Sequence, residues 1–222
     1  PGVVSRNNTT LNNKTDDAGM KAYYALLSQA EGVDSISQFN HPGTTFGNFS
    51  DFSYWDPVID SRMYMVEVGN GEGQIGAGGY YPSYEQYIMA LDKGWHLAPT
   101  NNQDNHKGRW GNANDSRDVI LTDNFTEEGI YEAIRALRMY ATEDKNLELG
   151  YTVNGQMMGS SITEVPEKLD LEVTVNDPDK SDSISKVEVV VNSGKVVHTW
   201  SDPAELNQGS LCLLYTSPSP RD

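Results

Sequence analysis

Apolar and polar residues alternate with two different periods along the chain, and the change of period divides the chain into two parts. Up to about residue 146, stretches with apolar residues at helical spacing alternate with short apolar runs. The predicted helices cover 16–30, 83–93 and a stretch capped by Thr126, and the predicted strands cover 35–40, 62–68, 95–99 and 118–122. This order is typical of βα units around a parallel sheet. We therefore predict an α/β region over residues 1–146.

After residue 146 the apolar residues recur at every second position, and no helical pattern interrupts them. The four alternating segments are LELGYTVNG, KLDLEVTVND, ISKVEVVVNSG and KVVHTWSD, and the turns between them are Asn-Gly, Asn-Asp-Pro-Asp and Asn-Ser-Gly. Alternation of period two with such turns is typical of antiparallel strands. Residues 147–211 are therefore predicted to form part of an antiparallel, Ig-like β-sandwich.

The last eleven residues, CLLYTSPSPRD (212–222), show no periodicity and contain the only cysteine of the chain. They match the in-frame translation of a transposase-type sequencing adapter, so we predict that this segment is not native and leave it out of the fold. Without Cys212 the chain has no thiol for a disulfide. A chain that starts at Pro1 and ends in such a segment is expected to be a fragment of a larger protein.

Charge and hydropathy narrow the class of partner. The 222 residues include 32 acidic and 16 basic side chains, for a net charge of −16. Nucleic acid is not expected as a binding partner, because its binding depends on Lys and Arg that neutralise phosphates. No apolar run approaches the roughly 18 residues of a membrane span. The acidic composition, the all-β appendix and the lack of other cysteines fit an extracellular or cell-surface bacterial protein.

A crowded polar segment, NNQDNH (101–106), follows the predicted strand at 95–99. Its short polar side chains disfavour helix and strand, so a loop is expected. In an extended loop Asp104 and His106 point the same way, and carboxylate and imidazole are suitable metal ligands. His41 also follows a predicted strand, just before Pro42 and Gly43 turn the chain. We therefore consider two interpretations for the loop, a metal site and a solvated connection.

Four motifs in this order resemble one known family. The motifs NHPG, VEVGNG, GWHLAPTNNQDNHKGRWG and IYEAIRALRMYAT are similar to the later half of a PHP (polymerase and histidinol phosphatase) metal-dependent hydrolase, close to its CehA/McbA-like branch. The resemblance covers residues 30–146. It implies the C-terminal part of a distorted (β/α)7 barrel with two or three divalent cations (Mn, Zn or Fe). His41 matches a late histidine ligand of the family, and Asp104 and His106 match its final Asp-x-His.

The resemblance also implies an activity, namely hydrolysis by a metal-bound hydroxide, in the first place of a phosphoester. The substrate would be a small anionic or ester molecule. The family's early His-x-His has no counterpart here, so we expect the chain by itself to be inactive.

Several further side chains could assist such a site. Arg109 is the better candidate for binding an anionic substrate, and Lys107 and Arg117 could equally be surface cations. Glu67 could orient a metal ligand, or it could be a buried strand-end carboxylate that the backbone satisfies. Trp110 could line the pocket or pack beneath it.

The alternative function is a non-catalytic cell-surface scaffold, whose β-sandwich binds a carbohydrate or another protein. His96 is predicted to face the barrel wall or the core, and His198 is predicted to be a structural residue of a sandwich strand. The motif GEGQIG (71–76) has the spacing of a dinucleotide-binding loop, but Glu72 would repel a pyrophosphate and no helix follows directly.

Overall fold

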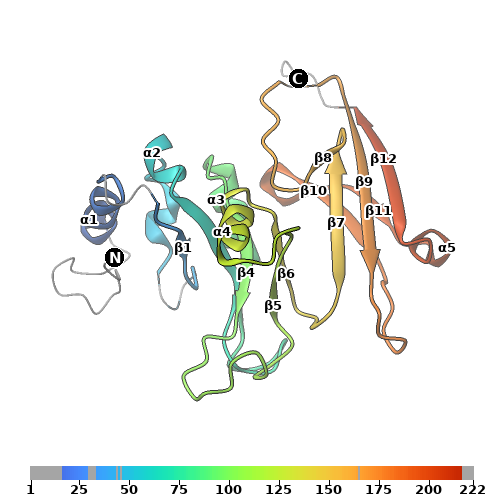
Figure 1. Cartoon of the computed structure of the whole chain (residues 1–222), viewed down its shortest axis with the longest axis horizontal. Helices are drawn as coiled ribbons and strands as arrows, with labels where there is room; N and C mark the ends of the chain where they lie inside the picture. Colours follow the sequence, from blue (N-terminus) through green and yellow to red (C-terminus); the bar gives the residue numbers. More distant parts are fainter. Residues whose placement is uncertain (1–16, 30–33, 44, 46, 165, 217–222) are drawn as a thin grey trace.

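The computed structural model describes residues 17–29, 34–43, 45, 47–164 and 166–216. The loop predicted over residues 1–15 lies outside these residues. The described chain is a mixed α/β structure with several small sheets, and antiparallel pairing predominates. Figure 1 shows the mixed region, which holds the N-terminal elements, beside a second region made mostly of strands. No helix of the described residues is long and apolar enough to cross a membrane.

The parallel pairing predicted for the first region is present in three strands. β2 (Met63–Asn70) pairs in parallel with β1 (Ser37–Phe39) and with β4 (Ala98–Asn102). A short strand, β3 (Tyr81–Pro82), pairs antiparallel with the end of β2. β4 begins three residues later than the predicted strand and includes two of the asparagines that were assigned to the loop. The carboxyl ends of β1, β2 and β4 therefore share one edge of the sheet.

Local sequence signals set the ends of the helices. Asp56 caps α2, Thr126 accepts a hydrogen bond from the Gly129 N–H at the start of α4, and Gly94 follows α3 with φ +94°. A left-handed residue just after a helix is a common stop, and glycine adopts it without strain. The helical elements described in the first region are α1 (Asp17–Leu27), η2 (Phe49–Phe52), α2 (Pro57–Asp60), α3 (Tyr84–Asp92) and α4 (Glu127–Arg135).

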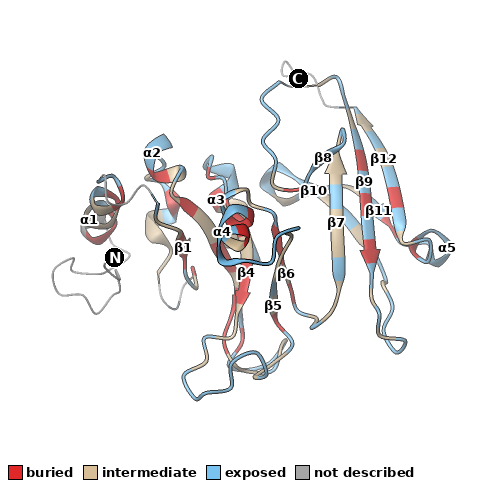
Figure 2. Ribbon diagram, viewed as in Figure 1, coloured by how far each residue is buried: buried red, intermediate tan, exposed pale blue. Residues whose placement is uncertain are grey.

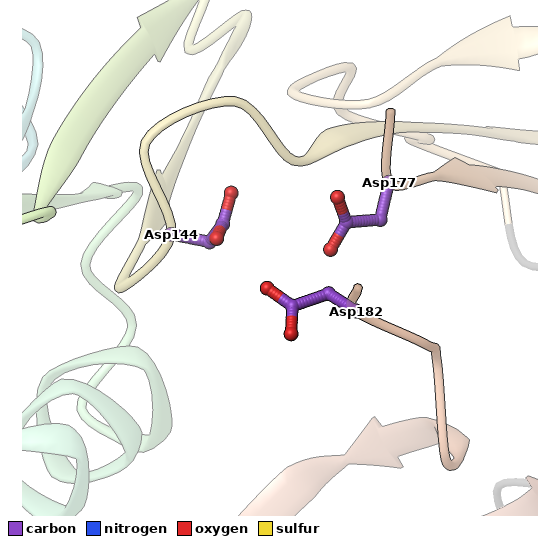
Figure 3. Close-up of side chains that lie close together, drawn as sticks. All are labelled: Asp144, Asp177 and Asp182. Atoms are coloured by element: carbon purple, nitrogen blue, oxygen red, sulfur yellow. The ribbon is translucent and has the colours of Figure 1, made fainter. Parts of the chain in front are cut away.

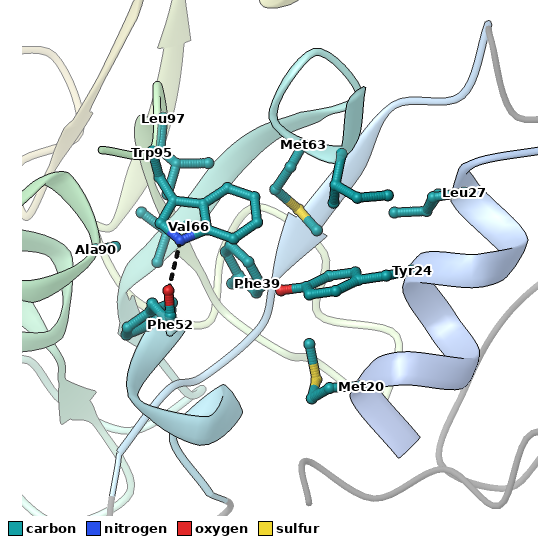
Figure 4. Packing of buried hydrophobic residues seen from close by; sticks show 11 residues of the cluster. Met20, Tyr24, Leu27, Phe39, Phe52, Met63, Val66, Ala90, Trp95 and Leu97 are labelled. Carbon is teal, nitrogen blue, oxygen red and sulfur yellow. Dashed lines mark hydrogen bonds between the residues drawn. The ribbon is translucent and has the colours of Figure 1, made fainter. Parts of the chain in front are cut away.

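An aromatic core holds α1 and η2 against the parallel sheet (Figure 4). Phe39 has no exposed surface, and its ring meets the ring of Trp95 edge-on at 5.2 Å. The Trp95 indole N–H donates to the Phe52 carbonyl over 2.9 Å, so the one polar atom of that side chain is satisfied inside the core. Tilted and edge-on ring pairs add to the stabilisation that comes from buried area.

The predicted barrel does not continue beyond β4 in this structure. β5 (Arg117–Ile120) pairs antiparallel with β6 (Met139–Thr142) instead of adding a parallel strand, and no closed barrel forms among the described residues. Leu137, two residues after the end of α4, has φ +54°, and the chain there turns back so that β6 lies beside β5. The strand predicted at 118–122 is therefore present, but the expectation that it pairs in parallel is wrong.

The second region consists of antiparallel strands, as predicted from the alternation. β7 (Glu148–Val153) and β12 (Ser210–Thr216) flank β9 (Lys168–Asn176), and β8 (Gln156–Met157) pairs with β7. β10 (Val187–Val191) and β11 (Lys195–Trp200) form a separate hairpin around η3 (Asn192–Gly194). A shared core joins the two sheets and α5 (Pro203–Leu206), and its buried members are Leu171, Val173, Trp200, Leu206 and Leu211. Figure 2 shows the alternation of buried and exposed residues along β9.

The structure includes part of the segment that we left out of the fold. Cys212–Thr216 continues β12 and pairs in register with β9, where Leu213 lies opposite Leu171. Leu211 is buried and Leu213 packs against the same core, whereas Leu214 is 63% exposed. Our interpretation that residues 212–216 have no periodicity is therefore wrong, because their side chains alternate between the core and solvent along β12. Residues 217–222 lie outside the described residues, and the origin of the segment as an adapter remains a prediction.

Candidate functional site

The strand ends bring three of the predicted site residues to one edge of the parallel sheet. His41 lies two residues after β1, Glu67 lies in β2, and Asp104 lies two residues after β4. His41 has φ +39° and Asp104 has φ +46°. Left-handed backbone is uncommon for residues other than glycine and concentrates at functional sites. The two candidate ligands thus share an unusual conformation at the same edge.

Glu67 is the centre of the hydrogen bonds at this edge. Its carboxylate accepts from the backbone N–H of His41, from Asn102 Nδ2 at 2.8 Å and from Asn70 Nδ2 at 3.1 Å. Burial raises the pKa of Glu67 to about 7; these hydrogen bonds oppose the rise, and the charge of Asp104 adds to it. With 2% exposure, Glu67 is a buried carboxylate that ties the ends of β1, β2 and β4 together. Side chains as well as backbone satisfy it, so the interpretation of a carboxylate that the backbone alone satisfies was incomplete.

Asp104 and His106 lie next to each other on the loop after β4. Asp104 Oδ1 is 3.1 Å from His106 Nε2, and the side chains are 47% and 81% exposed, respectively. Two ligands of one ion, each at about 2.1 Å from it, lie about 3 Å apart, so the pair fits a shared cation. Among the described residues, however, the ligand atoms of His41, Asp104 and His106 do not form a group within 4.8 Å of one another. The pair fits a cation, and the full predicted triad is not assembled.

The loop at 103–114 packs against the glycine-rich loop at 71–79. Lys107 Nζ lies 2.9 Å from Glu72 Oε1, and Asn105 Nδ2 donates to the other oxygen of Glu72 at 2.9 Å. The nearby cations lower the pKa of Glu72, Lys107 most of all through its hydrogen bond. Asn114 Nδ2 donates to the carbonyl oxygens of Gly71 and Gly73. Lys107 is therefore already paired with a carboxylate, which makes it the weaker candidate for a substrate anion.

Arg109 remains accessible in the same loop. Its backbone N–H donates to Asn105 Oδ1 at 2.8 Å, and its guanidinium Nη2 donates to the Ala113 carbonyl at 3.3 Å. The side chain is exposed, as is that of Trp110 at 82%. Trp110 thus neither packs beneath the loop nor lines a closed pocket. Arg117 donates to the carbonyls of Asn114 and Ser116, so it has a structural role in the loop.

A second carboxylate, that of Asp118, fixes the end of β4 from the other side. Asp118 Oδ1 accepts from the Asn101 N–H at 2.5 Å, and burial raises the pKa of Asp118. Asn101 Nδ2 also donates to Tyr80 Oη at 2.9 Å and to the Thr142 carbonyl at 3.2 Å. The asparagines at 101 and 102 therefore anchor the strand end rather than forming a flexible loop. Sequence reasoning missed this role, although their position directly after an apolar run was a usable signal.

One group of three acidic residues lies elsewhere, and the sequence reasoning did not select it. In the described part of the chain, Asp144, Asp177 and Asp182 offer carboxylate oxygens within 4.8 Å of one another, and Figure 3 shows the three side chains converging. Oxygen ligands of this kind suit Ca²⁺ or Mg²⁺. Asp144 Oδ1 already accepts from the N–H groups of Asn146 and Leu147. The acid-rich turn at 176–182 was the available signal. Exposed acidic groups also gather without an ion, so the group by itself supports no function.

The two remaining histidines lie outside the carboxyl edge of the parallel sheet, since His96 precedes β4 and His198 lies in β11. His198 stacks edge-on against Trp200 at 4.4 Å between ring centroids, as expected for a structural residue of β11. His96 does not face the core, because its side chain is 60% exposed and pairs with Asp60. The expectation of a core histidine at position 96 was wrong.

Comparison with protein-family models, curated proteins and solved structures found no match to this chain.

Proposed function

We propose that the carboxyl edge of the parallel sheet belongs to the divalent-metal centre of a hydrolase, with His41, Asp104 and His106 as ligands. The observation that carries the proposal is the convergence of β1, β2 and β4 on one edge, where Glu67 binds the backbone of His41 and the side chain of Asn102. The carboxyl ends of parallel strands are where α/β folds place their sites. On this proposal, the first region is the later part of a PHP-type barrel and residues 147–211 are part of an Ig-like sandwich.

Each residue at the edge has a distinct task under this proposal. Bound divalent cations would lower the pKa of a coordinated water and supply hydroxide near neutral pH. Asp104 and His106 would hold a cation from one loop, since their ligand atoms already lie 3.1 Å apart. Glu67 would position the strand ends that present His41 and the 103–106 loop. A shift of these ends by one ångström would misplace the ligands, so a rigid buried carboxylate suits the task.

The proposed substrate class follows from Arg109, the cationic side chain of this loop whose guanidinium donates to a backbone carbonyl rather than to a carboxylate. Arg109 is exposed beside the proposed ligands, and an arginine binds a phosphate or carboxylate through two parallel hydrogen bonds. Lys107 is paired with Glu72 and contributes less. We propose a small anionic ester, in the first place a phosphoester.

Metal titration of this chain tests the proposal. Isothermal titration with Mn²⁺ and Zn²⁺ should show binding that weakens at least tenfold in Asp104→Asn and in His106→Gln, because each loses a direct ligand. Asp123→Asn, an exposed aspartate outside the edge, is the matched control and should bind as the wild type does.

A fourth variant distinguishes the proposed metal centre from the group formed by Asp144, Asp177 and Asp182. If Asp144→Asn abolishes binding while Asp104→Asn leaves it unchanged, the cation belongs to the Asp144, Asp177 and Asp182 group and the proposal is refuted. If the chain binds neither ion, the scaffold interpretation is favoured.

A further inference from the structure

A polar cleft lies at the other end of the parallel sheet from the proposed metal centre. It has a volume of about 290 Å³, and its walls come from the end of α2, the start of β2, the segment before β4, the end of α4 and the segment after β8. The residues that matter for its chemistry are Asp60, Ser61, His96, Arg135, Gly159 and Ser161. A cleft of this size is at the lower limit for small-molecule sites. It suits a compact ligand rather than a polymer.

Asp60 and His96 form an oriented pair in the cleft. Asp60 Oδ1 accepts from the His96 backbone N–H at 2.9 Å, and Asp60 Oδ2 lies 2.7 Å from His96 Nδ1. The Asp60 side chain is only 12% exposed, whereas that of His96 is 60% exposed. A carboxylate that bonds to Nδ1 fixes the ring orientation and leaves Nε2 to meet a ligand. The acidic partner is thus turned inward and the imidazole outward.

Arg135 supplies a cationic group on the wall formed by the end of α4. Its Nη2 donates to the Asp34 carbonyl at 3.0 Å, and its guanidinium carbon lies 5.9 Å from the centre of the Tyr131 ring. A guanidinium carries five N–H donors, so most of them remain for a ligand. The exposed ionic side chains that line the cleft are therefore Arg135 and His96, in a chain with 32 acidic and 16 basic residues.

The wall beside Arg135 is fixed by close backbone packing. Gly159 has φ +88°, and a Cβ at this position would lie 2.5 Å from the carbonyl oxygens of both Ala136 and Leu137. The Leu137 N–H donates to the Ile134 carbonyl and the Arg138 N–H donates to the Ala133 carbonyl, each at a distance of 2.9 Å. Two of the last carbonyls of α4 are thus already satisfied, which reduces the negative charge that a helix end would present to an anion.

We propose that this cleft binds a compact oxyanion, a phosphate or carboxylate group of a small ligand, between Arg135 and His96. The Arg135 guanidinium donates two parallel hydrogen bonds to the anion, His96 Nε2 donates a third when the ring is protonated, and the Ser161 hydroxyl lies at the rim. Asp60 is a positioning residue that holds the imidazole. This site is separate from the proposed metal centre and does not depend on it.

Titration with inorganic phosphate and with acetate, followed by the backbone amide signals in NMR, tests this proposal. The buffer is treated to remove metal ions, so that phosphate cannot bind through a cation at the carboxyl edge. We expect the amide signals of Gly159 and Ser161 to shift with phosphate, and binding to weaken about tenfold or more in Arg135→Gln and in His96→Asn. Arg138→Gln is the matched control, because it removes the same charge three residues away and does not line the cleft.

The relative affinities for phosphate and acetate show which kind of oxyanion the cleft binds, and two results would refute the proposal. Stronger binding of phosphate than acetate assigns a phosphate ligand, and the reverse assigns a carboxylate ligand. The proposal is overturned if neither anion shifts these signals, or if Arg138→Gln weakens binding as much as Arg135→Gln does, which would indicate unspecific charge attraction. Because metal is absent from the titration, none of these outcomes depends on the proposed hydrolase.

Discussion

Replacing Glu67 by Gln should remove a pH dependence from the stability of the folded chain. Glu67 is 2% exposed, and its pKa is raised from 4.5 to about 7, chiefly by burial. Between these two pH values the folded state keeps a proton that the unfolded state has released. The free energy of unfolding therefore falls as the pH rises from 4.5 to about 7, and Glu67 contributes little further change above that range.

The size of the effect follows from the change in pKa. One unit of pKa corresponds to about 1.4 kcal/mol, so a rise from 4.5 to about 7 corresponds to about 3 kcal/mol of lost stability at high pH. The Glu67→Gln variant keeps the shape of the side chain and avoids burying a charge. It loses one acceptor for Asn102 Nδ2, which costs about 1 kcal/mol and does not vary with pH.

Urea denaturation in metal-free buffer at about pH 5 and about pH 8 measures this difference. From about pH 5 to about pH 8, the free energy of unfolding of Glu67→Gln should rise by about 2–3 kcal/mol relative to that of the wild type. Glu132→Gln, an exposed glutamate on α4, is the control and should keep a constant difference from the wild type. If the difference in the free energy of unfolding between Glu67→Gln and the wild type is the same at both pH values, Glu67 is not buried as described and the arrangement of the edge is wrong.

Two further predictions concern a backbone position and the proposed substrate contact. Gly159→Ala should lower the midpoint of urea denaturation more than Gly155→Ala, because a Cβ at Gly155 meets nothing within 4 Å and costs only about 1 kcal/mol of left-handed strain. Equal losses would contradict the close packing of Gly159 against the end of α4. In a longer protein that carries this chain and hydrolyses phosphoesters, steady-state kinetics should show a raised KM for Arg109→Ala with kcat nearly unchanged. Lys107→Ala should change KM less because Lys107 pairs with Glu72, and a larger change for Lys107→Ala would contradict this assignment.

Signals confined to a few neighbouring residues were sufficient to predict many of the elements. The Thr126 cap, the left-handed stop at Gly94 and the alternation along β9 all depend on contacts within one turn or one strand. The parallel order of β1, β2 and β4 was also predicted, because the order of strands and helices along the first region is typical of βα units. The placement of His41 and Asp104 at one edge follows from that order alone.

Tertiary structure decided which strands pair beyond β4, and the sequence did not. β5 is an ordinary short apolar run, and it pairs antiparallel with β6 because the chain reverses at Leu137. Similarly, we left Cys212–Thr216 out of the fold, and the structure places it in a strand that pairs in register with β9. Where no tight turn joins two strands, their pairing depends on contacts between distant residues, which a local window of sequence does not contain.

The chemistry of individual side chains was also decided by distant contacts. Glu67 has a raised pKa because β1, β4 and their loops remove it from water, and a single glutamate in a strand does not reveal this. Asp60 and His96 are 36 residues apart, and Arg135 reaches the same cleft from another helix. The sequence determined the types of residue that could bind a cation or an anion. The fold determined which of them meet, because only packing brings separate segments within hydrogen-bond distance.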